Sequence, residues 1–254
     1  MLSYLYFKSS FNTNSPGSLR SARVLVPLIT AMVQPASVID FGCGGGSWLK
    51  AFEENGINDL LGVDGPWIDR KVFRLAPELL RYHDLTKPLE VGRRYDLASC
   101  LEVAEHLPAE AAPVLVANLV ALAPVVAFSA AVPAQFGKHH VNCQWPEYWA
   151  ALFDRFNYRP LDVLRWQVWD NSEVAWWYRQ NLILYVAPSF IEAHTEFGKG
   201  NPEPERPLRV IHPDCFGYHA DPSVVSLRRY MQSFPRVAAS SMGRAVKRLL
   251  GRPL

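Results

Sequence analysis

The stretch Ser37-Val-Ile-Asp-Phe-Gly-Cys-Gly-Gly-Gly46 decides the fold of this chain. Its first residues form a short β-branched run, its glycines follow at once, and a helical pattern runs from Ser47 to Asn55. Glycines between a strand and a helix allow a tight turn and let a ligand approach main-chain N–H groups closely. Asp64 ends the next predicted strand, where an acid can accept two hydrogen bonds from a ribose diol. The sequence therefore predicts a binding loop for a ribose-containing ligand.

Outward from this loop, short apolar runs alternate with helical patterns. Further strands are predicted at 60–64, 79–83, 95–101 and 125–130, and further helices at 19–33, 109–122 and 147–156. Two aromatic-rich strand candidates, Asp162–Trp169 and Asn181–Val186, close the region without a full helix between them. This order predicts an α/β fold with a doubly wound, mostly parallel sheet, an antiparallel edge hairpin and a C-terminal helical extension.

Composition narrows the class of protein. The chain has 254 residues, 49% of them hydrophobic, and a net charge of +2. Such a chain can bury a sizeable core, and its near-neutral charge argues against nucleic acid as a partner. Four scattered cysteines without a CxxC pair indicate a reducing compartment, and the first residues lack the pattern of a signal peptide. We therefore expect a cytoplasmic protein.

The apolar run Val114–Ala134 is long enough to span a bilayer. Pro124 and Pro133 would break a helix there, and much of the run is weakly hydrophobic alanine. We expect a helix end, a turn at Pro124 and a buried parallel strand instead.

The chain divides by composition into an arm at 1–17, a main domain at 18–187, and a tail at 188–254. Residues 188–222 are rich in proline, which predicts an irregular linker. Val224–Leu250 reads as one or two helices, with seven basic and no acidic residues out to Arg252. We expect a solvated helix packed on the domain; contact of this basic helix with a membrane surface is the less favoured alternative. The tail is net +4 and the rest is net −2.

The glycine loop has three possible interpretations as a ligand-binding site. A dinucleotide site would need a third glycine where Ser47 stands, and a phosphate-binding loop would need Gly-Lys-Ser/Thr. S-adenosylmethionine (SAM) has no phosphate and carries a cationic sulfonium and an amino group, which the acids Asp40 and Asp64 suit. Glycines that serve only a tight turn are the remaining alternative.

The same segments resemble the class I (Rossmann-like) SAM-dependent methyltransferases over roughly residues 20–187. Val38–Gly46 resembles their motif I, Gly62–Asp64 their second-strand acid motif, Tyr82–Leu85 their third-strand motif and Tyr95–Pro108 their fourth-strand motif. The resemblance implies SAM as cofactor, with Asp64 on the ribose and Asp84 on the adenine amino group. The cofactor-binding residues expected from it are Asp40, Gly42, Cys43, Gly44, Asp64, Asp84, Leu101 and Glu102.

Methyl transfer mainly requires that the acceptor be aligned with the sulfonium. A hydroxyl acceptor also needs its proton removed or its oxygen polarised by a metal. Glu102-x-x-Glu105-His106 and His139-His140 follow two parallel strands, whose carboxyl ends lie at the same edge of a sheet. We predict Glu105, His106 and His140 as catalytic residues, with either imidazole as general base.

Two carboxylates and two imidazoles also suit a divalent metal ion, with Glu102, Glu105, His106 and His140 as ligands. The pattern resembles metal-assisted methyltransferases, including small-RNA 2′-O-methyltransferases and some quinone O-methyltransferases. In the alternative interpretation, Glu105 sits in the first turn of a helix and His106 packs against the cofactor.

Six of the eight tryptophans fall between Trp145 and Trp177. Amides beside aromatic faces suit sugars and flat rings, although about half of these tryptophans would fill the core. The expected substrate-binding residues are Asn142, Gln144, Trp145, Trp176, Trp177 and Arg179. We expect O-methylation of a small-molecule or glycan-type acceptor; the alternatives are an RNA 2′-O-methyltransferase and a non-catalytic SAM-binding protein.

Overall fold

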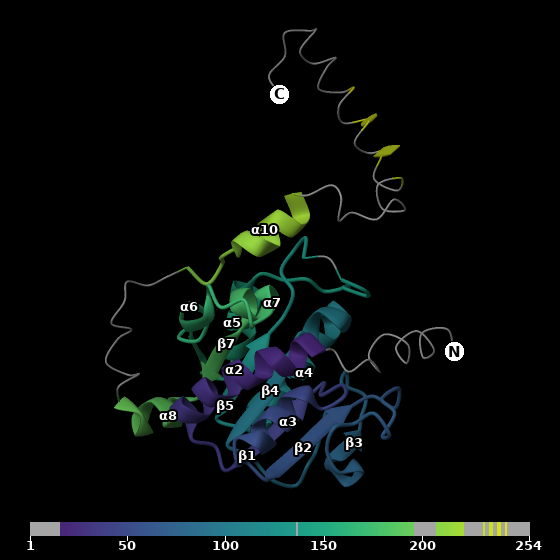
Figure 1. The fold of residues 1–254 in the computed structure, drawn as a ribbon. Helices are drawn as coiled ribbons and strands as arrows, with labels where there is room; N and C mark the ends of the chain where they lie inside the picture. The colour runs from purple at the N-terminus through teal and green to yellow at the C-terminus, as the bar shows by residue number, and fades with distance from the viewer. Residues whose placement is uncertain are drawn as a thin grey trace. The chain divides into compact units, whose positions relative to one another are not determined.

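The computed structural model describes residues 16–135, 137–195 and 207–220, and also residues 231, 234, 235, 238, 239 and 242. Within them a seven-stranded sheet has the order β3-β2-β1-β4-β5-β7-β6 (Figure 1). The strands are β1 (Ser37–Phe41), β2 (Asp59–Asp64), β3 (Leu80–Tyr82), β4 (Leu97–Leu101), β5 (Val125–Ser129), β6 (Arg159–Leu161) and β7 (Ile183–Val186). Strand β7 pairs antiparallel with both of its neighbours, β5 and β6, and the other neighbouring strands pair parallel.

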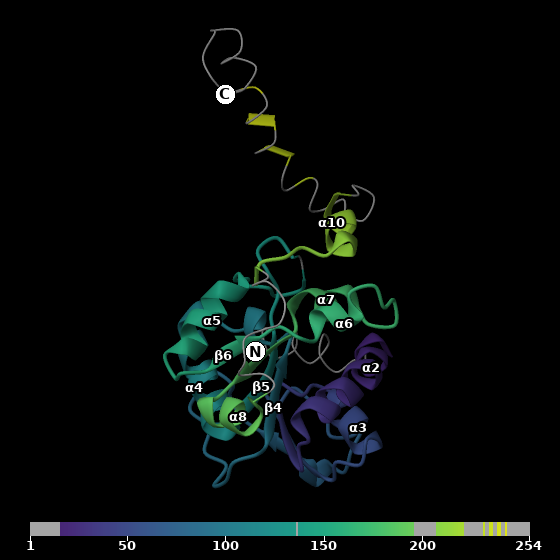
Figure 2. The ribbon, with the colours of Figure 1, turned by 90° about the vertical axis from the view of Figure 1, so that its left-hand side faces the viewer.

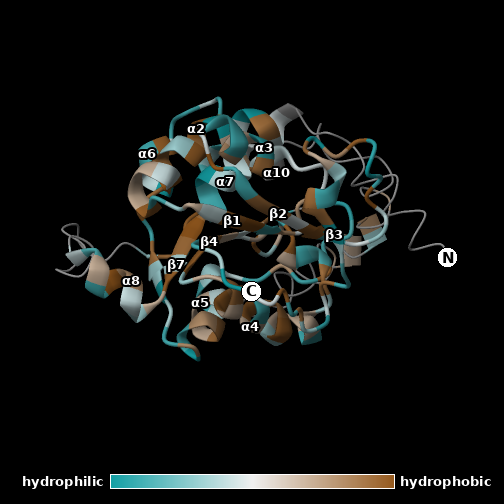
Figure 3. Cartoon of the chain, turned by 90° about the horizontal axis from the view of Figure 1, so that it is seen from below, coloured by the Kyte–Doolittle hydropathy of each residue, from teal (hydrophilic) through white to brown (hydrophobic). Residues whose placement is uncertain are grey.

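Helices cover both faces of the sheet (Figures 2 and 3). One face carries α2 (Pro16–Val33), α3 (Ser47–Glu54), α6 (Arg165–Val168) and α7 (Trp176–Asn181), and the other carries α4 (Ala112–Leu122) and α5 (Pro146–Asp154). Side chains alternate along β1, so Val38 packs in the core under α2 and α3, while Ile39 and Phe41 pack under α4 and α5. Because both faces are covered, β1, β4 and β5 are buried along their whole length.

The expected doubly wound, mostly parallel sheet is confirmed. The chain builds β1, β2 and β3 in one direction and returns to β4 on the other side of β1. Loops that leave β1 and β4 therefore diverge, and open sheets bind ligands in the crevice at such a reversal. The glycine loop follows β1 at this point.

The apolar run Val114–Ala134 folds as expected. Helix α4 ends at Leu122, and Val125–Ser129 forms β5, which is buried and parallel to β4. Among the described residues, no helix combines the length and apolarity that a membrane crossing requires.

The prediction of a strand at Asp162–Trp169 is wrong. Edge strand β6 ends at Leu161, and α6 covers Arg165–Val168. The guanidinium of Arg165 binds the carboxylate of Asp162, three residues earlier. Residues three apart share one side of a helical turn but face opposite sides of a strand, so this pair favours the turn. The strands β6 and β7 do pair antiparallel, but α6 and α7 lie between them in the chain.

Two compact units make up the chain, Met1–His212 and Pro213–Leu254. In the first, α8 (Pro188–Ala193) follows β7, and residues 207–212 pack on the domain through Leu208 and His212. In the second, α10 spans Pro213–Ala220. The arm predicted at 1–17 lies outside the described residues up to Pro16, where α2 begins, and the helix predicted at Val224–Leu250 lies almost wholly outside them.

Candidate active site

The glycine loop joins β1 to α3 with left-handed backbone at Gly42 and Gly44, whose φ angles are 87° and 52°. A Cβ on Gly42 would lie 2.4 Å from Cγ2 of Val103, whereas a Cβ on Gly44 would meet no atom within 4 Å. Packing therefore requires a glycine at position 42. At position 44 the glycine leaves open space in front of the loop.

Two buried acids lie beside this loop. Asp64 accepts the N–H of Gly44 at 2.7 Å and the N–H of Gly65 at 2.6 Å, and burial raises the pKa of its carboxyl to about 6. Asp40 accepts the hydroxyl of Ser99 at 2.7 Å, and burial raises its pKa to about 7. Asp40 thus links β1 to β4, while Asp64 reaches the loop.

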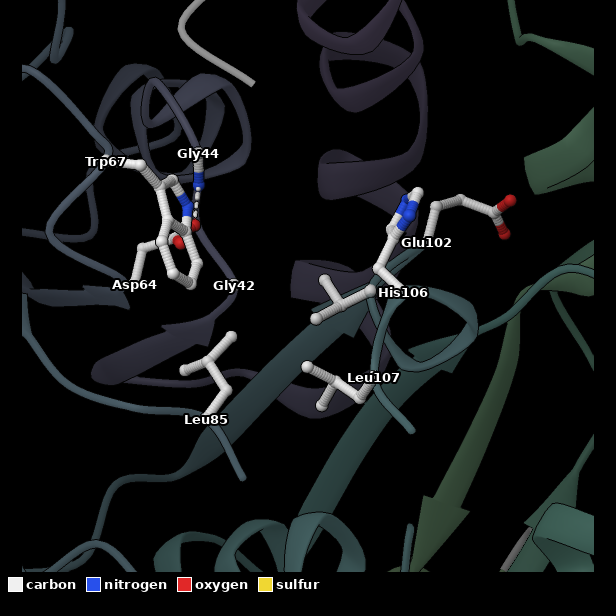
Figure 4. Close-up of a pocket in the computed structure, with 9 residues that line it drawn as sticks. Gly42, Gly44, Asp64, Trp67, Leu85, Glu102, His106 and Leu107 are labelled. Carbon is white, nitrogen blue, oxygen red and sulfur yellow. Dashed lines mark hydrogen bonds between the residues drawn. The ribbon is translucent and has the colours of Figure 1, made fainter. Parts of the chain in front are cut away.

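A pocket opens where β1, β2 and β4 end (Figure 4). It contains five of the predicted residues: Gly42, Gly44, Asp64, Glu102 and His106. Sequence reasoning missed four others that line it: Trp67, Leu85, Val103 and Leu107. The available signal was position, because Trp67 follows the acid Asp64 by three residues and Leu85 follows β3 by three.

Four predicted cofactor residues do not line this pocket: Asp40, which bonds Ser99, and Cys43, Asp84 and Leu101. Asp84 is exposed and accepts the main-chain N–H and the hydroxyl of Thr86, at 3.0 Å and 2.7 Å. Leu101 is buried at the end of β4, and Cys43 is buried against Gly62. Their contacts with a cofactor stay predictions.

Glu105, His106 and His140 lie together beside this pocket. One ligand atom from each lies within 4.8 Å of the others. The imidazoles meet edge to face with centroids 5.0 Å apart, and Nε2 of His140 lies 4.0 Å from Oε1 of Glu105. The carbonyl of Glu105 accepts the N–H groups of Val141 and Asn142. These bonds hold the loop after β5 against the 3₁₀ turn Ala104–His106 that follows β4.

Burial dominates the electrostatics of this cluster. The side chain of Glu105 is fully buried, and neither of its oxygens has a hydrogen-bond partner within the described part of the chain. Burial, together with the charge of Glu102, raises the pKa of Glu105 well above its usual value. Burial lowers the pKa of His106 to about 4 and also lowers that of His140. Both imidazoles are therefore neutral near pH 7.

Contacts around His140 leave its ring little freedom. Its Nδ1 lies 2.9 Å from the carbonyl oxygen of Gln135. A Cβ on Gly137 would lie 2.0 Å from its Nε2, so a side chain at position 137 would displace the ring.

Glu102 lies beside Glu105 and has further contacts of its own. Its φ angle is 55°, and its main-chain N–H donates to the carbonyl and hydroxyl of Ser129. The side-chain amides of Gln135 and Asn181 donate to its two carboxylate oxygens at 3.1 Å and 3.2 Å. Burial raises its pKa to about 7.

The predicted acceptor residues lie outside the pocket lining. Gln144 donates to the buried Asn142 at 3.0 Å, and Arg209 stacks 4.5 Å above the ring of Trp145. Trp176 and Trp177 are half-buried in α7, and Trp177 packs against the core. Arg179 is buried and donates to the carbonyl of Trp169. Of the six tryptophans from 145 to 177, Trp149 is buried and the others are half-buried, so their contacts with an acceptor stay predictions.

A family model described as a methyltransferase domain matches residues 19–172, which include every strand from β1 to β6. The chain belongs to this family. It is a class I SAM-dependent methyltransferase, as the fold and the ordered motifs indicated. A comparison with curated proteins gives no match.

Solved structures share the fold of this methyltransferase. DesVI of Streptomyces venezuelae is 12% identical over 73% of this chain and 96% of its own, with a TM-score of 0.51. A putative O-methyltransferase from Nostoc punctiforme is 12% identical over 72% of this chain and 59% of its own, with a TM-score of 0.51. The magnesium protoporphyrin IX methyltransferase of Synechocystis was solved with bound S-adenosylhomocysteine (SAH). It is 16% identical over 73% of this chain and 98% of its own, with a TM-score of 0.50. At such identities the likeness concerns the fold alone.

Proposed function

We propose that this methyltransferase transfers the methyl group of SAM to an oxygen of a small-molecule or glycan-type acceptor. One observation carries the proposal: a single pocket joins the open glycine loop and Asp64 to Glu102 and His106 (Figure 4). Cofactor-binding groups and proton-accepting groups therefore share one space.

The residues at the first end fit the cofactor. The open side of Gly44 admits a ligand to the loop, and the carboxylate of Asp64 can accept hydrogen bonds from ribose hydroxyls. Trp67 and Leu85 offer apolar surface on which an adenine ring can pack. Bound there, SAM supplies an electrophilic methyl group.

The residues at the second end suit a hydroxyl acceptor. Because Nδ1 of His140 donates to the carbonyl of Gln135, its Nε2 carries the lone pair that can take the hydroxyl proton. Glu105 lies 4.0 Å from that nitrogen, and an imidazolium formed there would favour the ionised form of its carboxyl group. We assign the base to His140, whose ring lies against that of His106, the histidine that lines the pocket.

A divalent cation also fits this cluster. Oxygen and nitrogen donors within 4.8 Å of one another are suitable ligands, and a bound cation would favour the ionised form of the buried Glu105 carboxyl group. Glu105, His106 and His140 would hold the ion, which would supply Lewis-acid polarisation of the acceptor oxygen. Glu102, whose oxygens already accept two amides, is a weaker candidate ligand. Metal analysis of tag-free protein and assays with a chelator test this: no bound ion and unchanged activity remove the cation.

Transfer of label from radioactive SAM to a panel of acceptors tests the proposal. The panel contains hydroxylated sugars, phenols, amines and short RNAs. We expect label on a sugar or small-molecule hydroxyl. Label only on amines or RNA, or SAH binding without any transfer, contradicts the proposal.

The variant Gly137→Ala tests the role of His140. The added Cβ displaces the imidazole, so we expect methyl transfer to fall by about a hundredfold while SAH affinity is unchanged. Gly217→Ala is the matched control, because a Cβ there meets nothing within 4 Å. Equal activity of the two variants excludes His140 as the base.

A further inference from the structure

Four polar side chains are buried beside the active site without a part in the chemistry above. Gln135, Gln180, Asn181 and His212 are exposed by 5%, 1%, 5% and 3%. Burying an amide is costly unless its hydrogen bonds are made, and a fully satisfied network fixes one arrangement of its members. Such a network therefore determines where its neighbours lie.

Gln135 lies at the centre of this network. Its Oε1 accepts the side-chain amides of Asn181 at 3.0 Å and Gln180 at 3.4 Å, and its Nε2 donates to Glu102 at 3.1 Å. Asn181 donates to the other oxygen of Glu102 at 3.2 Å. The carboxylate of Glu102 is therefore held at both oxygens by amides that are themselves held in place.

The main chain of Gln135 contacts the second functional group. Its carbonyl accepts Nδ1 of His140 at 2.9 Å. The turn from Val132 to Gln135 is closed by the main chain, at 2.9 Å, and by the Gln135 side chain, whose Oε1 accepts the N–H of Val132 at 3.2 Å. The side chain that holds Glu102 thus also fixes the turn that presents the carbonyl to His140.

Support for the network comes from far along the chain. The main-chain N–H of His212 donates to Oε1 of Gln180 at 2.9 Å, and the ring of His212 bonds the carbonyl of Trp169. Residue 212 lies 40 positions beyond the segment that matches the methyltransferase family model. The network is therefore completed by a part of this chain outside the family match.

We propose that Gln135 is a positioning residue for the acceptor end of the pocket. Its side chain presents the carboxylate of Glu102, which has further lone pairs for hydroxyl or amino donors of the acceptor. Its carbonyl keeps His140 in the tautomer that has its lone pair at Nε2. The acceptor role rests on the proposed function; the positions of Glu102 and His140 do not.

Exchanging the residues at positions 102 and 135 tests whether Gln135 positions Glu102. Gln135→Glu places two carboxylates together, and Glu102→Gln places two amides together, so each single variant should unfold at a lower temperature. The double variant restores one carboxylate and one amide, and with them the unfolding temperature. Its kcat/KM for the acceptor should stay roughly ten- to a hundredfold low, because the carboxylate has left position 102. Gln167→Glu, at an exposed position of α6, is the matched control.

Two outcomes of this exchange overturn the proposal. If the double variant regains wild-type turnover, the location of the carboxylate is irrelevant. If the affinity for SAH falls as far as kcat/KM for the acceptor, Glu102 serves the cofactor instead.

A second readout needs no acceptor. Nitrogen NMR of the His140 ring, in metal-free protein, should show protonation at Nδ1 in the wild type and a mixture of tautomers in Gln135→Met. An unchanged tautomer in a folded Gln135→Met overturns the proposal. If that variant unfolds, Gln135→Glu gives the same test, and the double exchange variant should return to the wild-type tautomer. If the wild-type protein methylates no acceptor, the proposed function is contradicted, but the result on the His140 tautomer still holds.

Discussion

Gly42 and Gly44 share a left-handed backbone but differ in their surroundings. We expect Gly42→Ala to cost about 2–4 kcal/mol of stability, because the left-handed strain adds to overpacking against Val103. Gly44→Ala should cost about 1–2 kcal/mol. Its methyl group enters the cofactor space, so SAH affinity should fall by at least roughly tenfold.

Urea unfolding and calorimetry with SAH measure these two effects. Equal stability losses for the two variants, or full SAH affinity in Gly44→Ala, would contradict the different roles of the two glycines.

Asp64 should make cofactor binding sensitive to pH. Burial raises the pKa of Asp64 to about 6, and the ionised form is the one that accepts hydrogen bonds from a ribose diol. SAH affinity should therefore fall as pH decreases through about 6. The free energy of unfolding changes in the opposite direction. Because the pKa of Asp64 is raised in the folded state, this group lowers stability as pH rises from about 4 to about 6.

Calorimetric titration with SAH from pH 5 to 8 tests this dependence on Asp64. In Asp64→Asn the affinity should be weak and independent of pH across this window. A pH dependence that persists in this variant assigns it to another group.

At the scale of secondary-structure elements, Arg165 joins three segments. Its guanidinium binds Asp162 and donates to the carbonyls of Gln180 and Leu208 at 2.8 Å and 2.9 Å. We expect Arg165→Met to cost about 3–5 kcal/mol, because it leaves the buried carboxylate of Asp162 without its counter-ion.

Arg93 is the matched control for Arg165. Its guanidinium makes the same two-pronged pair with Asp59, but both side chains are nearly half exposed. Arg93→Met should cost no more than about 1 kcal/mol. Similar losses for the two variants in urea unfolding would show that burial does not set the strength of these pairs.

Elements with long, regular patterns were predictable. Helices α2, α3, α4 and α5 and strands β1, β2, β4 and β5 lie where apolar spacing placed them, within a few residues. The conformation of Asp162–Trp169 was not predictable, because its apolar residues alternate as in a strand. The pairing of Arg165 with Asp162, and with carbonyls far along the chain, decides its conformation instead.

At the scale of the whole molecule, the boundary of the catalytic domain is testable by truncation. We expect a chain ending at His212 to keep the unfolding temperature and SAH affinity of the full protein, because Met1–His212 is a compact unit. A chain ending at Ala187, the boundary predicted from composition, loses the bonds from Leu208 and His212 to Arg165 and Gln180. Each buried group left unpaired costs about 1–3 kcal/mol, so this chain should unfold at a lower temperature. Equal unfolding temperatures would place the boundary at residue 187.

The sequence by itself determined the fold class, the glycine loop and its acids, since these depend on local spacing and on short motifs at strand ends. It also named Glu105, His106 and His140, because the carboxyl ends of parallel strands share one edge. Tertiary structure alone decided that the carboxylate of Glu102 accepts the amides of Gln135 and Asn181, and that Trp67 lines the pocket. The physical reason is that hydrogen bonds between residues 33 to 79 positions apart leave no periodic signal in the chain.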